Sequence, residues 1–97
     1  MKAYELLFII APSTDEETRA NTMNRIQGVI TSAEGSVDNV DEWGKRKLAY
    51  EINGLTDGDY TLVNFHADPQ NVAELDRVLR INDAVVRHMI VKREDRD

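Results

Sequence analysis

The sequence predicts an α+β fold with the element order βαββαβ, and three observations lead to this prediction. Two stretches repeat apolar residues at helical spacing, four stretches are rich in β-branched and aromatic residues, and turn or cap signals separate them. The 97 residues are enough for one domain with one hydrophobic core. In this order, two split βαβ units form a four-stranded antiparallel sheet with both helices on one face, the ferredoxin-like arrangement.

The first strand and the first helix are predicted from residues 2–35. Residues 2–10 are apolar on both alternating faces, which is typical of a central strand. Ser13 and Thr14 are each followed three residues later by a glutamate, the spacing of a helix capping box. An apolar stripe at helical spacing runs from Ala20 to Ala33, and Gly35 is placed for a left-handed cap that ends the helix.

The second and third strands surround two competing turn signals. Residues 36–52 predict an unusually long strand, in which Gly44 and the broken spacing of the valines indicate a bulge or bend. Turn signals follow at residues 53–54 and 57–58, and their competition favours a loop of several residues over a two-residue hairpin. The third strand is therefore expected over residues 60–67.

The second helix and the last strand complete the predicted domain. Asp68 is expected as the N-cap and Pro69 as the first helical residue, before an apolar stripe at helical spacing. The chain then turns into a strand over residues 84–92. We expect residues 1–93 to form a single ferredoxin-like domain and residues 94–97 a charged tail.

Charge is distributed unevenly along the chain, whose net charge is −6. Residues 15–42 carry seven acids and two bases, whereas residues 77–93 carry five bases and one acid. An acidic side and a basic side could bind a basic protein and an RNA respectively, or both could be ordinary solvated surface. The candidates for RNA contact are the clustered bases, Lys45, Arg46, Lys47, Arg80, Arg87 and Lys92, followed by Lys2 and Arg93.

The sheet face opposite the helices is predicted to be apolar and uncovered. This is more apolar surface than a monomer usually leaves in water, so the pattern predicts a protein partner on this face. The predicted partner-binding residues are Leu7, Ile9, Tyr60, Leu62, Met89 and Val91.

Patterns typical of catalysis, metal binding and cofactor binding are missing from the sequence. The chain contains no cysteine, and His66 and His88 have no partners at motif spacing. Acylphosphatases share the predicted topology, but they need a Gly-rich phosphate loop with an arginine, whereas residues 11–15 are acidic and Gly-free. RNA-recognition motifs share it too, yet Tyr60 is the only aromatic expected on the uncovered face of the central strands. We therefore expect no enzyme activity, no cofactor, no metal and no membrane span.

Three segments carry a resemblance to a known family: YELLFIIAP at 4–12, DEWGKRKLAYEI at 41–52 and RINDAVVRHMIVK at 80–92. In order and spacing they resemble the bacterial small-subunit ribosomal protein six family over nearly the whole chain. One departure is Glu51, where many members have proline, and we expect only a local effect on the strand.

The resemblance implies a non-catalytic protein of the cytoplasmic ribosome. Members of that family pair with small-subunit ribosomal protein eighteen, a small basic protein. The pair binds the central domain of the small-subunit rRNA and supports assembly of the platform. Neither a small-molecule substrate nor a membrane is implied.

Two alternatives remain open from the residues alone. The first is an acyl-phosphate hydrolase on the same fold, which turnover of acetyl phosphate would reveal. The second is a homo-oligomeric regulatory module that binds a small metabolite at its sheet edges. A stable homodimer in isolation would favour the second alternative.

Overall fold

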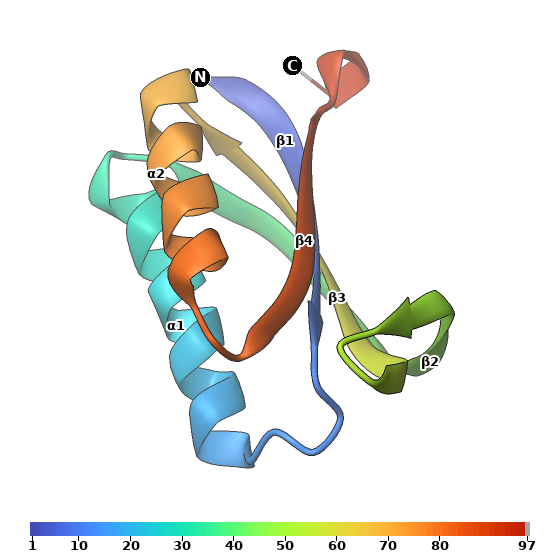
Figure 1. Ribbon diagram of the computed structural model, residues 1–97. Helices are drawn as coiled ribbons and strands as arrows, with labels where there is room; N and C mark the ends of the chain where they lie inside the picture. The colour runs from blue at the N-terminus through green and yellow to red at the C-terminus, as the bar shows by residue number, and fades with distance from the viewer. Residues whose placement is uncertain (97) are drawn as a thin grey trace.

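A computed structural model describes residues 1–96 and confirms the predicted fold class (Figure 1). Four strands form an antiparallel sheet in the order β2-β3-β1-β4, and both helices pack on one face of it. The elements are β1 (Lys2–Ile10), α1 (Glu16–Ser32), β2 (Ser36–Ile52), β3 (Leu55–Ala67), α2 (Pro69–Ile81), β4 (Val85–Lys92) and the 3-10 helix η1 (Glu94–Arg96).

The hydrophobic core lies between the sheet and the two helices. Phe65 and Tyr4 stack within it, with ring centroids 5.7 Å apart. Burying each large apolar side chain stabilises the fold by about 1.5–3 kcal/mol. The largest fully buried side chains come from both layers: Leu6, Phe8, Val63 and Phe65 from the sheet, and Ile26, Ile30, Leu75 and Leu79 from the helices.

The start of α1 differs from its prediction. Asp15 is the N-cap, and its Oδ1 accepts a hydrogen bond from the backbone N–H of Thr18 at 3.0 Å. A hydrogen bond with the Thr18 side chain and, with a smaller effect, the bond from the Thr18 backbone hold the pKa of Asp15 below its usual value. The predicted capping boxes at Ser13 and Thr14 are wrong, because the Thr14 N–H donates to the Ala11 carbonyl in a turn that precedes the helix. At the other helix, Asp68 and Pro69 occupy the predicted positions, although the Asp68 side chain makes no cap hydrogen bond with the described residues.

The buried stripe of α1 and its end also differ from prediction. Ala20 and Ala33 are exposed, and Thr22 is buried instead. The residue in the left-handed region is Glu34, with φ 66°, rather than Gly35. A Cβ at Gly35 would lie 2.3 Å from the Ile30 carbonyl oxygen. Glycine is therefore needed there for close approach of the backbone rather than for a left-handed cap.

The turn between β2 and β3 is a two-residue hairpin, so the prediction of a longer loop is wrong. Asn53 and Gly54 both have positive φ, 50° and 82°, and Ile52 pairs with Leu55 across them. Positive φ at both central residues matches the twist of the flanking strands and selects this short turn. The second turn signal, at residues 57–58, lies inside β3, which is longer than predicted.

Strand β2 is long and irregular, as predicted. Its pairing with β3 shifts register between Val37 and Asn39, between Glu42 and Gly44, and again before Ile52. Gly44 has φ 80°, which fits a bulge at the predicted bend.

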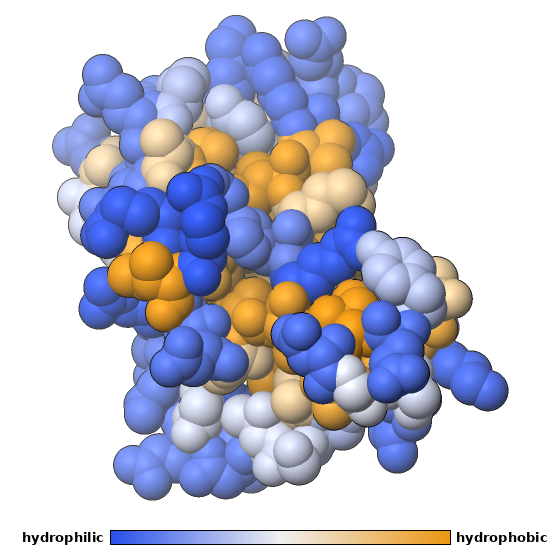
Figure 2. Space-filling model, viewed as in Figure 1, coloured by the Kyte–Doolittle hydropathy of each residue, from blue (hydrophilic) through white to orange (hydrophobic). Residues whose placement is uncertain are grey.

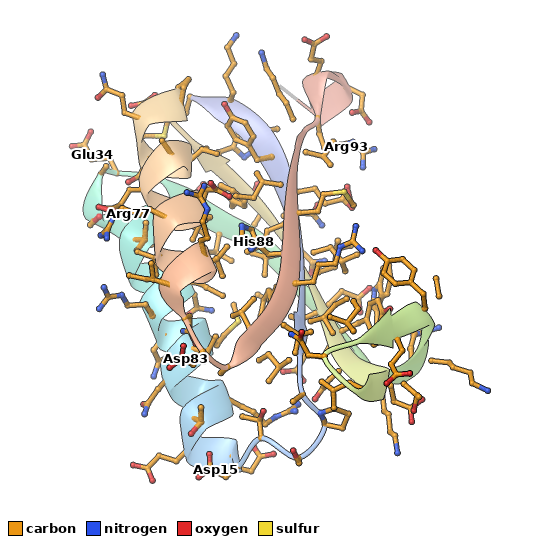
Figure 3. All side chains as sticks on the ribbon, in the orientation of Figure 1. Asp15, Glu34, Arg77, Asp83, His88 and Arg93 are labelled. Atoms are coloured by element: carbon orange, nitrogen blue, oxygen red, sulfur yellow. The ribbon has the colours of Figure 1, made fainter. Side chains whose placement is uncertain are left out.

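Arg93 joins the end of β4 to the first strand (Figure 3). Its backbone N–H donates to the Ala3 carbonyl at 2.8 Å, and its guanidinium binds Glu5 at 2.5 Å and Asp95 at 3.1 Å. Both carboxylates hold the pKa of Arg93 above its usual value, Asp95 through the larger effect. The division into a domain over 1–93 and a tail over 94–97 stays a prediction, and Asp97 lies outside the described residues.

Candidate protein and RNA interfaces

The sheet face away from the helices carries a patch of exposed apolar side chains. Leu7 on β1 pairs with Leu62 on β3 and with Met89 on β4, which sets these three side chains side by side. Met89 is 53% exposed and Val91 is 43% exposed, while Leu7 and Leu62 are half-buried. We call Leu7, Leu62, Met89 and Val91 the open-face patch.

The hairpin of β2 and β3 covers one end of this face. Figure 1 shows it projecting from the sheet on the side away from the helices. Ile9 is only 7% exposed, so the expectation that it lies uncovered is wrong. Gly58 lies directly against Ile9, because an added Cβ would lie 2.3 Å from Ile9 Cγ2, and Leu48 is buried beside them.

A small apolar cavity of about 170 Å³ lies between the hairpin and the open face. Figure 2 shows apolar side chains gathered between β4 and the hairpin. Arg87 lines the cavity, its guanidinium donating to the Tyr50 hydroxyl and lying 5.7 Å from the ring centroid. Tyr50 and Arg87 thus tie the hairpin to β4 across the face. The cavity is lined chiefly by Leu7, Ile9, Leu48, Ile52, Tyr60 and Met89.

Next to this cavity, Trp43 stacks on Tyr60. Their rings are nearly parallel, at 10°, with centroids 6.2 Å apart. Arg46 lies 5.5 Å over the Trp43 ring, and Asp41 accepts a hydrogen bond from the indole N–H at 3.2 Å. In the sequence, Trp43 stands next to Gly44 at the predicted bend, and no pattern there predicts its contact with Tyr60. The signal that could have found it is the bulge at Gly44, which changes the alternation of β2 and brings Trp43 to Tyr60.

The six predicted RNA-contact residues do not form a single patch. Lys45, Arg46 and Lys47 follow one another on β2 where it enters the hairpin, and all three are exposed. Arg87 and Lys92 lie on β4, the opposite edge strand of the sheet. Tyr50 in the hairpin contacts Arg87 on β4. The structure therefore brings the group at residues 45–47 toward the group formed by Arg87 and Lys92.

Arg80 stands apart from the other candidates. It lies on α2, in the helix layer, where it forms an ion pair with Asp76. Asp76 also accepts a hydrogen bond from His88 Nε2 at 2.7 Å, and Figure 3 shows His88 pointing from β4 toward α2. The His88 hydrogen bond, with a smaller effect of Arg80, holds the pKa of Asp76 below its usual value. Asp76 is thus shared by Arg80, one turn further along α2, and by His88, which joins β4 to the helix layer.

His66 has a comparable contact on the open face. Its Nδ1 lies 2.5 Å from Asp38 Oδ2, which joins β3 to β2. Neither histidine belongs to a group of three or more metal-ligating side chains within residues 1–96. No helix in this part of the chain has the length and apolar character to cross a lipid bilayer.

A protein-family model described as ribosomal protein S6 matches residues 3–92. The chain belongs to this family. It is 53% identical over 94 residues to small ribosomal subunit protein bS6 of Clostridium beijerinckii, with 97% of this chain and 99% of the relative covered. The bS6 protein of Clostridium botulinum strain Hall is also 53% identical, with 97% and 100% covered.

Solved structures agree with this assignment. The crystal structure of 30S ribosomal protein S6 from Thermotoga maritima has a TM-score of 0.88 at 39% identity, covering 97% of this chain and 89% of that one. The C-terminal domain of MgtC from Mycobacterium tuberculosis has a TM-score of 0.65 at 12% identity, which shows a shared fold alone.

Membership of the S6 family settles the broad functional predictions. The chain is a structural component of the small ribosomal subunit, located on the cytoplasmic ribosome. The prediction of a non-enzymatic protein is confirmed, which excludes the acyl-phosphate hydrolase alternative.

Proposed function

We propose that this S6 protein binds small-subunit ribosomal protein eighteen through its open sheet face. We further propose that the pair binds the central domain of the small-subunit rRNA and supports assembly of the platform. The observation that carries the proposal is the open-face patch, which stays exposed beside the hairpin on a chain of net charge −6. Exposed apolar surface favours a protein partner, and the negative charge favours a basic one.

The open-face patch supplies most of the proposed protein contact. Met89 and Val91 on β4 offer the largest exposed fractions, and Leu7 on β1 and Leu62 on β3 continue the patch across the sheet. Tyr60 contributes from its stack with Trp43, whereas Ile9 can contribute only through the floor of the cavity beneath the hairpin. The proposed partner-binding residues remain Leu7, Ile9, Tyr60, Leu62, Met89 and Val91.

The proposed RNA contacts lie on two edges of the same sheet. Lys45, Arg46 and Lys47 approach phosphates from the hairpin side, and Arg87 and Lys92 from β4. Arg80, which is exposed on α2, stays a further candidate from the helix layer. Each protein alone presents few phosphate contacts. Joining the two proteins fixes both sets of contacts in one body, so that the second set binds at high effective concentration.

The protein contact is tested by Leu62→Asp, with Ile81→Asp as the matched control. Both substitutions place a carboxylate on an apolar surface site, but Ile81 is a 62% exposed residue of α2 in the helix layer. We expect Leu62→Asp to abolish binding of purified protein eighteen in calorimetry, and Ile81→Asp to leave it unchanged. Urea unfolding of both variants checks that each still folds. Unchanged binding by Leu62→Asp, or a stable homodimer of the isolated chain, would contradict the proposal.

The RNA contact is tested by the salt dependence of binding. The complex with protein eighteen is titrated against a central-domain rRNA fragment at several salt concentrations. Lys47→Ala should reduce the slope of log affinity against log salt by about one unit. Arg77→Ala is the control, because Arg77 lies on α2 and is paired with Glu74 at 2.6 Å. Affinity that does not change with salt would rule out the phosphate contacts.

A further inference from the structure

A second cavity lies on the helix side of the sheet, between α1 and the strands. Its volume is about 420 Å³. Phe8, Ile10 and Met23 give it an apolar interior, while Asn24, Gln27 and Glu42 add polar groups. We call it the α1–β2 crevice. A cavity that combines an apolar wall with a carboxylate suits a ligand with an alkyl stem and a cationic head.

Thr61 adds a hydroxyl group to the wall of the crevice. Its side chain lines the crevice and is only 8% exposed, yet it makes no hydrogen bond with any described residue. Thr61 and Glu42 are paired in the ladder of β3 and β2, so the hydroxyl and the carboxylate are neighbours on the same face. No buried side-chain polar atom of the described residues lacks a hydrogen-bond partner, so the Thr61 hydroxyl is open to the crevice and can accept from a group that enters it.

Among the described residues, the one cation that lines the crevice is already engaged. Arg19 forms an ion pair with Asp59 and lies 3.6 Å from Glu16. The carboxylate of Glu42 makes no ion pair with any described residue. The charge left uncompensated in the crevice is therefore negative, which favours a cation and disfavours an anion.

We propose that the α1–β2 crevice receives an arginine or lysine side chain of the basic partner protein. The alkyl stem packs against Phe8 and Met23, and the cationic head donates to Glu42 and to the Thr61 hydroxyl. Asp41 lies on the open face, where it binds Trp43, and Glu42 lies on the crevice side. A partner segment that crosses the edge of β2 at this point reaches both faces. This inference rests on the proposed function, because it takes the basic partner as the source of the side chain.

The first experiment measures the affinity of purified protein eighteen for three variants. Glu42→Gln removes the charge and keeps the shape, and we expect it to weaken binding about tenfold at low salt. Thr61→Val removes the hydroxyl, and we expect about threefold weaker binding. Glu17→Gln, an equal change of charge on an exposed residue of α1 outside the crevice, should have no effect. Urea unfolding checks the fold of each variant.

The outcome separates this inference from the proposed function. If Leu62→Asp abolishes binding while Glu42→Gln behaves like Glu17→Gln, the crevice inference is overturned and the open-face contact stands. If Leu62→Asp has no effect but Glu42→Gln weakens binding, the open-face contact fails and the crevice contact stands.

A second experiment needs no partner. The ¹⁵N-labelled chain is titrated with Nα-acetyl-arginine amide, and with Nα-acetyl-norleucine amide as the uncharged control. We expect saturable shifts at the amides of Gln27, Glu42 and Thr61 with the arginine probe alone, and their loss in Glu42→Gln. Equal shifts with the norleucine probe, or no saturable shift at these amides, would overturn the inference.

Discussion

The two faces of the sheet are formed by the same strands but differ in how far they are buried. On β1, Leu6 is fully buried under the helices, while its neighbour Leu7 is half-buried on the open face. On β3, Phe65 is 1% exposed and Leu62 is half-buried. Both faces are apolar, so composition alone does not distinguish them. What differs is the cover: two helices close one face, whereas a hairpin closes only one end of the other. The first face is therefore expected to determine stability, and the second binding.

The largest expected effect compares truncations on the two faces of β3. Phe65→Ala should lower the free energy of unfolding by about 3–5 kcal/mol, because it leaves a cavity in the closed core. Leu62→Ala should lower it by about 1 kcal/mol, because Leu62 is already partly in water. Urea unfolding of both variants measures the difference. Equal losses would mean that the open face is as important for stability as the core.

The next effect tests whether the hairpin acts as part of the fold. Leu48 is buried at 9% exposure between the hairpin and the open face, so Leu48→Ala should cost about 2 kcal/mol. Val40→Ala, on the same strand at 36% exposure, should cost less than about 1 kcal/mol. Hydrogen exchange should accelerate at the hairpin amides in the first variant only. Similar behaviour of the two variants would show that the hairpin is an independent appendage.

A smaller effect concerns the contact between α2 and β4. Asp76→Asn removes the carboxylate that accepts from His88 and pairs with Arg80, and we expect a loss of about 1 kcal/mol at neutral pH, since the group is partly exposed. Asp38→Asn, which breaks the contact with His66 on the open face, should cost less. Urea midpoints at neutral pH compare the two.

The pH dependence of the Asp76 contribution has a definite sign. The pKa of Asp76 is lowered in the folded chain, so its stabilising effect is complete above the ordinary pKa of an aspartate, about 4. The effect is lost as the pH falls from there through the lowered pKa of the folded state. Asp76→Asn should therefore flatten the stability curve in that acidic range. A variant curve parallel to that of the parent chain would contradict the assignment.

The smallest effect concerns the contact between Tyr50 and Arg87. Tyr50→Phe removes the hydroxyl that accepts from Arg87 but keeps the ring beneath the guanidinium. Because Tyr50 is 60% exposed, we expect a loss of about 0.5 kcal/mol. The effect should appear as faster exchange of hairpin amides, with the amides of β1 unchanged. Unchanged hairpin exchange would show that the hydroxyl contact does not hold the hairpin.

The sequence predicted the sheet better than it predicted its junctions. Strand periodicity places successive residues on opposite faces, which is why Leu62 and Phe65 could be separated correctly without a structure. The hairpin could not be predicted, because two similar turn signals compete and only the pairing of Ile52 with Leu55 decides between them. For the same reason, the burial of Ile9 was missed, since it depends on where the hairpin lies.

The candidate sites show the same limit. The open-face patch follows from alternation along three strands, and it was predicted. The stack of Trp43 on Tyr60 depends on a bulge at Gly44 that shifts alternation by one residue, and although Gly44 marks the bend in the sequence, it does not indicate which side chains the shift brings together. Arg80 is separate from Arg87 and Lys92 because it lies on α2 in the helix layer while they lie on β4, and a count of charges along the chain does not distinguish the two layers.

The position of β1 in the sheet has a consequence for how the chain is made. β1 leaves the ribosome before either of its partner strands, because it pairs with residues 59–67 and 85–92. The apolar faces of β1 therefore remain without strand neighbours until most of the chain has been translated. Contacts between distant segments must also overcome the entropy of closing long loops, so they form slowly. We expect the nascent chain to depend on β1 staying free of other unpaired strands until β4 has emerged.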